Sequence, residues 1–193
     1  MFLEKNSKDK VDVRIDTPQK NLERFTEVLL YIFKKLESKQ HAGKTVIYKI
    51  LYFIDFDYYE KYEEQLIGLT YIKDTHGPTP LEFGKAIREM LQNRDLALKT
   101  DKYSISLREP DFSKLKPNEI EIIDKTIGRL GDMNAAKMCE YSKGDIPWIG
   151  TDFKEIIKYE SVFYRTPEYS VRKTEFDKGD EIDIFVDDTY DWY

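Results

Sequence analysis

Few of the residues that build covalent, metal or phosphate sites occur in this sequence of 193 residues, which has one cysteine, two histidines and nine glycines. The single cysteine, Cys139, cannot form an internal disulfide, and we expect it to pack as a small hydrophobic residue. The glycines form neither a phosphate-binding loop nor a dinucleotide-binding fingerprint, which argues against the common forms of nucleotide chemistry. The sequence therefore predicts no cofactor.

Long apolar runs are also missing. No stretch of about 18 uninterrupted apolar residues occurs, so no membrane span and no membrane partner are predicted. The first residues, MFLEKNSKDKVDVRID, are charged and differ from a secretory signal. We therefore expect a cytoplasmic protein, and its hydrophobic content of 40% is sufficient for one main core.

Positive charge is scarce at the C-terminal end, where the net charge of −6 is concentrated. From Glu175 onward, eight acidic residues stand against Lys178 alone, and the rest of the chain is nearly neutral. Because no general basic surface exists, we do not expect direct nucleic-acid binding. Phe185, Tyr190 and Trp192 lie among the acids, and this composition suits docking into a basic, apolar groove.

Helical periodicity dominates the middle of the chain. The segment 44–62 has apolar or aromatic residues on two neighbouring stripes, which is typical of a central, buried helix. Other helices are predicted at 21–38, 81–93, 117–130 and 134–141, with a weaker one at 152–164.

Two short β-segments are predicted beside these helices. Residues 69–75 read as a strand that ends at a rigid turn over 77–80, and residues 96–107 read as a hairpin. The fold class is thus mainly α with a small β-element (α+β). We divide the chain into an N-terminal extension (1–20), one main domain (21–168) and an acidic-aromatic extension (169–193). Alternating residues predict a further short strand in each extension.

A carboxylate, Asp55, lies within the aromatic stripe of the predicted central helix. A buried carboxylate needs hydrogen bonds or an ion pair, so a structural role and a functional role are both open. With Asp57, Asp74 and His76 it forms the only set that suggests a metal-assisted hydrolase. The spacing of these four residues matches no established ligand motif, and no catalytic motif is present elsewhere.

The segments KILYFIDFDYYEKY, LIGLTYIKDTHGPTP and YSKGDIPW together resemble the Panacea domain, an antitoxin SocA-like family also found in phage and mobile-element proteins. The resemblance covers about residues 22–166. We take the motif residues and their neighbours as the predicted interface: Lys49, Tyr52, Asp55, Tyr59, Tyr71, His76, Gly77, Pro78, Pro80, Pro147 and Trp148. Lys143 stands where the family often has a histidine.

The resemblance implies a module without catalysis that binds and neutralises a cognate protein toxin encoded nearby. In some relatives the antitoxin instead delivers its toxin to a protease. Asp55 would then be a fold-defining carboxylate beside the turn at Gly77 and Pro78. The alternatives are the metal-assisted hydrolase and a mobile-element protein that binds a host factor through its acidic extension.

Overall fold

The computed structural model describes residues 19–37, 39, 43–97 and 105–172. This part of the chain is mainly α-helical and carries two small antiparallel sheets, which confirms the predicted fold class. The strands expected in the two extensions lie outside the described residues. No helix in the described ranges has the length and hydropathy that a membrane span requires.

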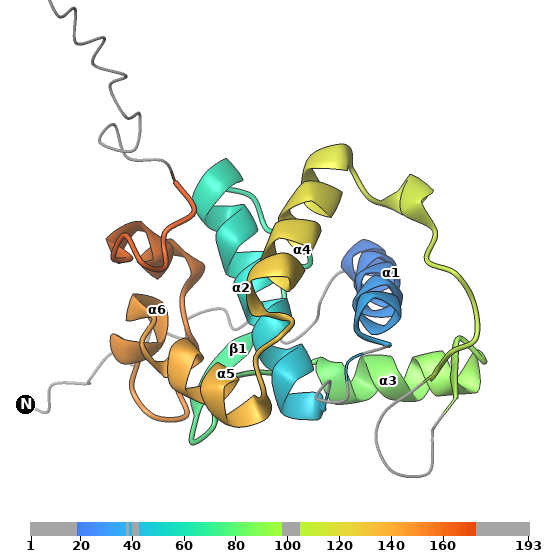
Figure 1. Ribbon diagram of the computed structural model, residues 1–193, viewed down its shortest axis with the longest axis horizontal. Coiled ribbons are helices and arrows are strands. Elements are labelled where there is room, and N and C mark those ends of the chain that lie inside the picture. The colour runs from blue at the N-terminus through green and yellow to red at the C-terminus, as the bar shows by residue number, and fades with distance from the viewer. Residues whose placement is uncertain (1–18, 38, 40–42, 98–104, 173–193) are drawn as a thin grey trace, which may run out of the picture.

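The described residues form six α-helices and two 3-10 helices, and one of the α-helices lies at the centre (Figure 1). They are α1 (Gln19–Leu36), α2 (Lys44–Tyr62), α3 (Phe83–Gln92), α4 (Pro117–Leu130), α5 (Ala135–Lys143), α6 (Ile146–Ile149), η1 (Phe112–Lys114) and η2 (Tyr159–Tyr164). Helix α2 is the central one and contacts α4, α5, η2 and the strand β2 described below. Thirteen of its nineteen residues are buried, so the two stripes correctly predicted a helix covered on most sides.

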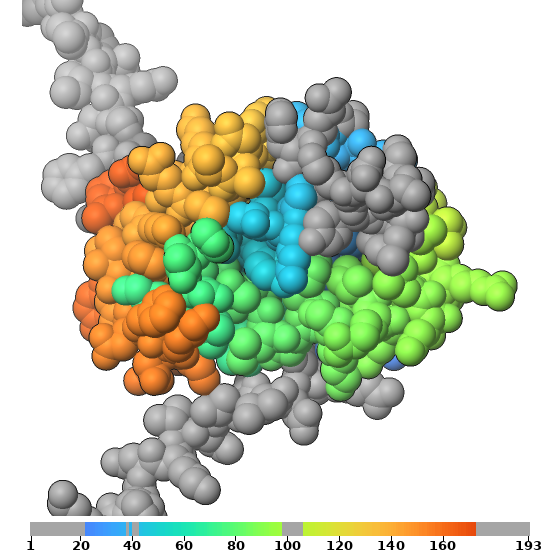
Figure 2. Space-filling view, turned by 90° about the horizontal axis from the view of Figure 1, so that it is seen from below, coloured from blue at the N-terminus to red at the C-terminus, as the bar shows by residue number. Residues whose placement is uncertain are grey.

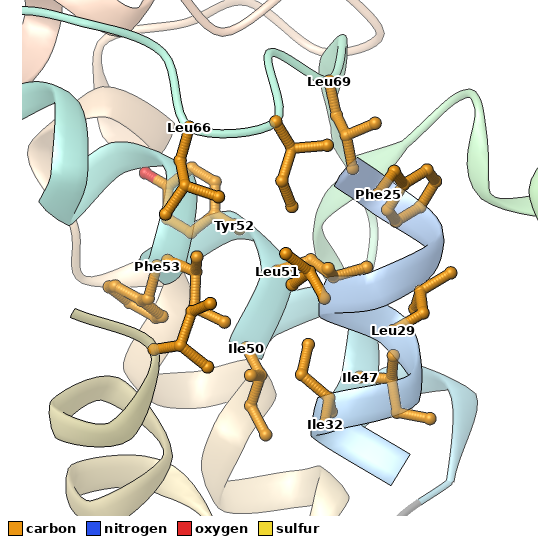
Figure 3. Packing of buried hydrophobic residues seen from close by; sticks show 14 of the residues in the cluster. Phe25, Leu29, Ile32, Ile47, Ile50, Leu51, Tyr52, Phe53, Leu66 and Leu69 are labelled. Carbon is orange, nitrogen blue, oxygen red and sulfur yellow. The ribbon is translucent and has the colours of Figure 1, made fainter. Parts of the chain in front are cut away.

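The core forms where α1 crosses α2. Figure 3 shows Phe25, Leu29 and Ile32 of α1 facing Ile47 and Leu51 of α2, all of them fully buried. Close-packed aliphatic and aromatic side chains of this kind give most of the free energy that favours folding. This packing of α1 against α2 fixes the position of α2, and the remaining segments are arranged around α2.

The first sheet pairs β1 (Tyr71–Asp74) with β2 (Gly77–Pro80), in the register Tyr71 to Pro80 and Asp74 to Gly77. The prediction of a rigid turn over 77–80 was therefore wrong, because these residues form a strand and the turn lies at residues 75–76. Proline cannot donate a ladder hydrogen bond, but β2 is an edge strand and tolerates it.

The segment after α6 covers the other edge of β1. The backbone N–H of Lys154 donates to Lys73 (2.8 Å), and the N–H of Ile157 donates to Tyr71 (2.8 Å). Residues 154–157 therefore lie alongside β1, and of the weak helix expected at 152–164 only the part at η2 is helical. The second sheet, β3 (Leu96–Ala97) with β4 (Ile105–Ser106), confirms the predicted hairpin.

Replacing Gly77 with alanine is expected to lower the free energy of unfolding by about 1 to 3 kcal/mol, because no room exists for a side chain. Gly77 has φ +94°, and an added Cβ would lie 2.5 Å from Oγ of Ser142 and 2.9 Å from Cε of Lys49. Urea unfolding measures the change. Gly128 on α4 has open space around it, so Gly128→Ala should instead stabilise by up to about 1 kcal/mol. Equal stability of the two variants would contradict this account.

Candidate functional site

Most residues of the predicted interface are buried around α2. The buried members are Lys49, Tyr52, Asp55, Tyr71, Gly77, Pro78, Pro80 and Pro147. Tyr59 and Trp148 are partly buried, and His76, at the tip of the first hairpin, is exposed. The buried motif residues can thus stabilise the fold while a partner contacts the exposed residues next to them.

Asp55 organises the connection between α2 and β1. Its carboxylate accepts hydrogen bonds from the backbone N–H groups of residues 67–69, the shortest being 2.7 Å, and from the hydroxyls of Tyr71 (3.0 Å) and Tyr159 (3.2 Å). Burial raises the pKa of Asp55 to about 6, against the lowering effect of these donors. These bonds support the structural role, because every donor belongs to a segment that packs on α2.

Lys49, rather than Asp55, makes the hydrogen bond to the residues that follow the hairpin turn. The buried ammonium donates to the carbonyl of Pro78 at 2.8 Å and lies under Gly77. Burial lowers the pKa of Lys49 to about 8. Lysine and carboxylate therefore hold two successive parts of the hairpin against the same helix.

Arg165 makes a second buried cluster with three carboxylates. Its Nη1 donates to Asp57 (2.8 Å) and Glu60 (2.9 Å) of α2, and its Nη2 donates to Asp145 (2.6 Å), which precedes α6. Asp145 also accepts from the hydroxyl of Tyr52 at 2.9 Å. Burial by itself would lower the pKa of Arg165, but Asp57 and Asp145 raise it above its ordinary value. The cluster joins α2 to both the start of α6 and the chain after η2.

Sequence reasoning missed Arg165, Glu60 and Asp145 as parts of one cluster. Arg165 is separated from Asp57 by 108 positions, so no local spacing links them. The only available signal was the high proportion of charged residues on a helix with two apolar stripes. Such charges need partners from elsewhere in the chain.

The four residues that the sequence suggested as a metal site take part in separate interactions. Asp57 pairs with Arg165 and also accepts from Nη2 of Arg129 at 2.6 Å, while Asp74 pairs with Lys154 at 2.7 Å. Within the described ranges, no group of three or more His, Cys, Asp or Glu residues is placed to hold a metal ion. The structure therefore does not bring Asp55, Asp57, Asp74 and His76 together as a hydrolytic centre.

A partly apolar surface lies on the outer side of α6 and β1. We call it the α6 face and define it by Lys73, Trp148, Ile149, Phe153 and Lys154. Ile149 is 53% exposed and Phe153 is 59% exposed. Figure 2 shows the green atoms of the hairpin next to the orange atoms of the segment that follows α5.

Lys73 holds the α6 face together. Its ammonium lies 4.2 Å from the ring centroid of Trp148 and donates to the carbonyls of Ile149 (3.3 Å) and Thr151 (2.7 Å). The ammonium of Lys154 lies 5.1 Å from the ring of Phe153. Exposed apolar groups bordered by cations are a composition found at protein interfaces.

The free energy of unfolding should depend on pH through Asp55. Its folded pKa of about 6 lies above the ordinary value of 3.8, so the folded state binds this proton more tightly. The contribution is complete below about pH 4 and is lost as the pH rises through 6. We expect the stability of the wild type minus that of Asp55→Asn to fall by roughly 2 kcal/mol between pH 4 and 6.5. A constant difference over this interval in urea titrations would contradict the assignment.

Removing Arg165 should destabilise the protein strongly. Arg165→Met keeps an unbranched, flexible side chain but leaves three buried carboxylates without their shared cation, and we expect a loss of about 3 to 5 kcal/mol in free energy of unfolding. Arg88→Met, at an exposed position of α3, is the matched control and should change stability by less than about 0.5 kcal/mol. Similar unfolding midpoints for the two variants would rule out a central role for Arg165.

Comparison with known families matches residues 47–149 to the antitoxin SocA-like, Panacea domain. The match extends from α2 to α6 and so includes Lys49, Asp55, the first hairpin and Trp148. No curated protein and no solved structure matches the chain significantly. Since the family match covers more than half of the sequence and contains the whole motif, the chain belongs to the antitoxin SocA-like, Panacea domain family.

Proposed function

We propose that this protein is an antitoxin-like binding module that neutralises a cognate protein toxin, encoded nearby, through a direct complex. The family supports a role in binding a protein. The observation that carries the proposal is the α6 face, where exposed Ile149 and Phe153 flank a partly buried tryptophan beside the family motif. Binding needs no catalytic centre. The buried charged residues of α2 instead help to hold this face in place.

The α6 face has the chemistry of an interface centre. Aromatic side chains bury a large area at low entropic cost, and a few such residues usually carry most of the binding free energy. The rigid attachment through Lys73 means that little ordering of this surface is required on binding. A stable complex buries roughly 1,200 to 2,000 Å² in total. The interface would therefore extend beyond the face, and His76 at the hairpin tip is the exposed member of the predicted interface.

The primary experiment expresses the neighbouring open reading frame in a test bacterium, alone and together with this protein. Growth arrest that co-expression relieves, with a complex that co-purifies, is the expected result. If the toxin level stays unchanged on co-expression and the toxin is found in the complex, neutralisation occurs by capture. If the toxin level falls in a protease-dependent manner, the protein acts as an adaptor that delivers the toxin to a protease. A harmless neighbour with no complex would refute the proposal.

Aspartate substitutions on the α6 face should remove toxin binding without unfolding the protein. We expect the double variant Ile149→Asp with Phe153→Asp to weaken the complex at least about tenfold, because charge is then buried at the interface centre. Leu107→Asp is the matched control, since Leu107 is an apolar residue of similar exposure, 55%, next to β4. Equal affinity of the double variant and the control, by calorimetry with purified toxin, would place the interface elsewhere.

A further inference from the structure

A groove between α2 and α4 is not used by the proposed function. It has a volume of about 240 Å³ and opens to solvent beside the last described residues. Its lining combines cations with apolar groups: Lys61 from α2, Ile122, Lys125 and Arg129 from α4, and Val171. An apolar floor with a cationic rim fits a ligand that carries an aromatic or aliphatic group between negative charges.

The charge of this groove is positive at the rim. Asp57 lines the inner part, but Arg165 and Arg129 already neutralise it. At the rim, Lys125 pairs with Glu121 at 2.5 Å, and Lys61 lies 3.8 Å from the same carboxylate. Two lysines thus share one carboxylate, and an incoming negative charge would gain a favourable partner.

Glu60 fixes the point at which the chain arrives at this groove. This buried carboxylate of α2 accepts hydrogen bonds from Oγ of Ser170, from the backbone N–H of Val171 (3.2 Å) and from Nε of Arg172 (3.3 Å). These bonds place Val171 in the groove wall. The described chain therefore ends at Arg172, one residue after Val171 of the groove wall.

The following 21 residues, 173–193, have the complementary composition. They contain eight acidic residues and two lysines, and their first aromatic residue, Phe176, lies between Glu175 and Asp177. We propose that residues 175–177 bind back into the α2–α4 groove of the same chain, with the ring of Phe176 on the apolar floor and the two carboxylates at Lys61 and Lys125. This proposal does not depend on the toxin-binding function.

The length of the linking chain, the volume of the groove and the effective concentration of the tethered segment all favour residues 175–177 as the occupant. Phe176 lies four positions after Arg172, and an extended chain over four positions spans about 13 Å. An apolar cavity of roughly 150 Å³ accepts benzene, so a groove of about 240 Å³ has room for one phenyl ring. A segment tethered at the groove has an effective concentration in the millimolar range, so even a weak contact is well populated.

Zero-length carbodiimide cross-linking of the full chain tests the proposal. The reagent joins a carboxylate directly to a lysine amine, and peptide mass spectrometry of the monomer band identifies the pairs. We expect Lys61 and Lys125 to be joined to Glu175 or Asp177, with yields several-fold higher than for exposed Lys85 on α3. The product should disappear at 1 M salt, because the charge pairs are then screened.

Two substitutions in the segment separate the specific contact from general charge attraction. Phe176→Ala should lower the cross-link at Lys61 about tenfold, since the apolar anchor is lost. Phe185→Ala removes the same side chain farther along and should leave the yield unchanged. The Lys154–Asp74 pair lies outside the groove and is the internal standard for reagent activity.

Three results would overturn the proposal. Cross-links spread evenly over exposed lysines would mean that the acidic segment has no preferred site. An equal effect of the two phenylalanine variants would mean that Phe176 is not the anchor. Cross-links at Lys61 found only in a covalent dimer would mean that the segment of a second copy occupies the groove.

Discussion

The buried guanidinium of Arg165 is the contact on which the second half of the fold depends. One planar cation is shared by Asp57 and Glu60 of α2 and by Asp145 at the start of α6. Since all four groups are removed from water, each relies on the others to offset its cost of desolvation. The position of the chain after η2 is therefore tied to α2, and so is the start of α6. This contact therefore contributes to the placement of the α6 face and of the α2–α4 groove.

The polar residues of α2 give the helix a defined orientation that apolar packing alone would not. Aliphatic side chains tolerate rotation and repacking, whereas Asp55 requires the N–H groups of residues 67–69 and Lys49 requires the carbonyl of Pro78. Each of these bonds can form at only one rotation and one depth of α2. The charges inside the core thus select one arrangement, at a cost in desolvation that the hydrogen bonds offset only in part.

The sequence predicted what depends on local periodicity and missed what depends on distant partners. The bounds of α2 were correct because its two stripes stop where the chain becomes polar, and the hairpin at 96–107 followed from its alternation. Gly77 to Pro80 was read as a turn because proline usually interrupts a sheet, and only the edge position of β2 makes the strand possible. Residues 154–157 are held by hydrogen bonds to β1, more than 80 positions earlier. The partners of Asp55 and Arg165 were likewise beyond any local pattern.

The division between buried and exposed residues explains why a family motif and a partner-binding surface need not coincide. Lys49, Asp55 and Pro78 are inside, so their identity is constrained by the frame whatever the protein binds. Ile149 and Phe153 are outside and make no hydrogen bond through their side chains, so they can change without disturbing that frame. A scaffold built in this way can keep its interior while its surface is adapted to different partners. Recognition of the family from sequence therefore identifies the scaffold, and the chemistry of the partner has to be read from the exposed residues that the scaffold presents.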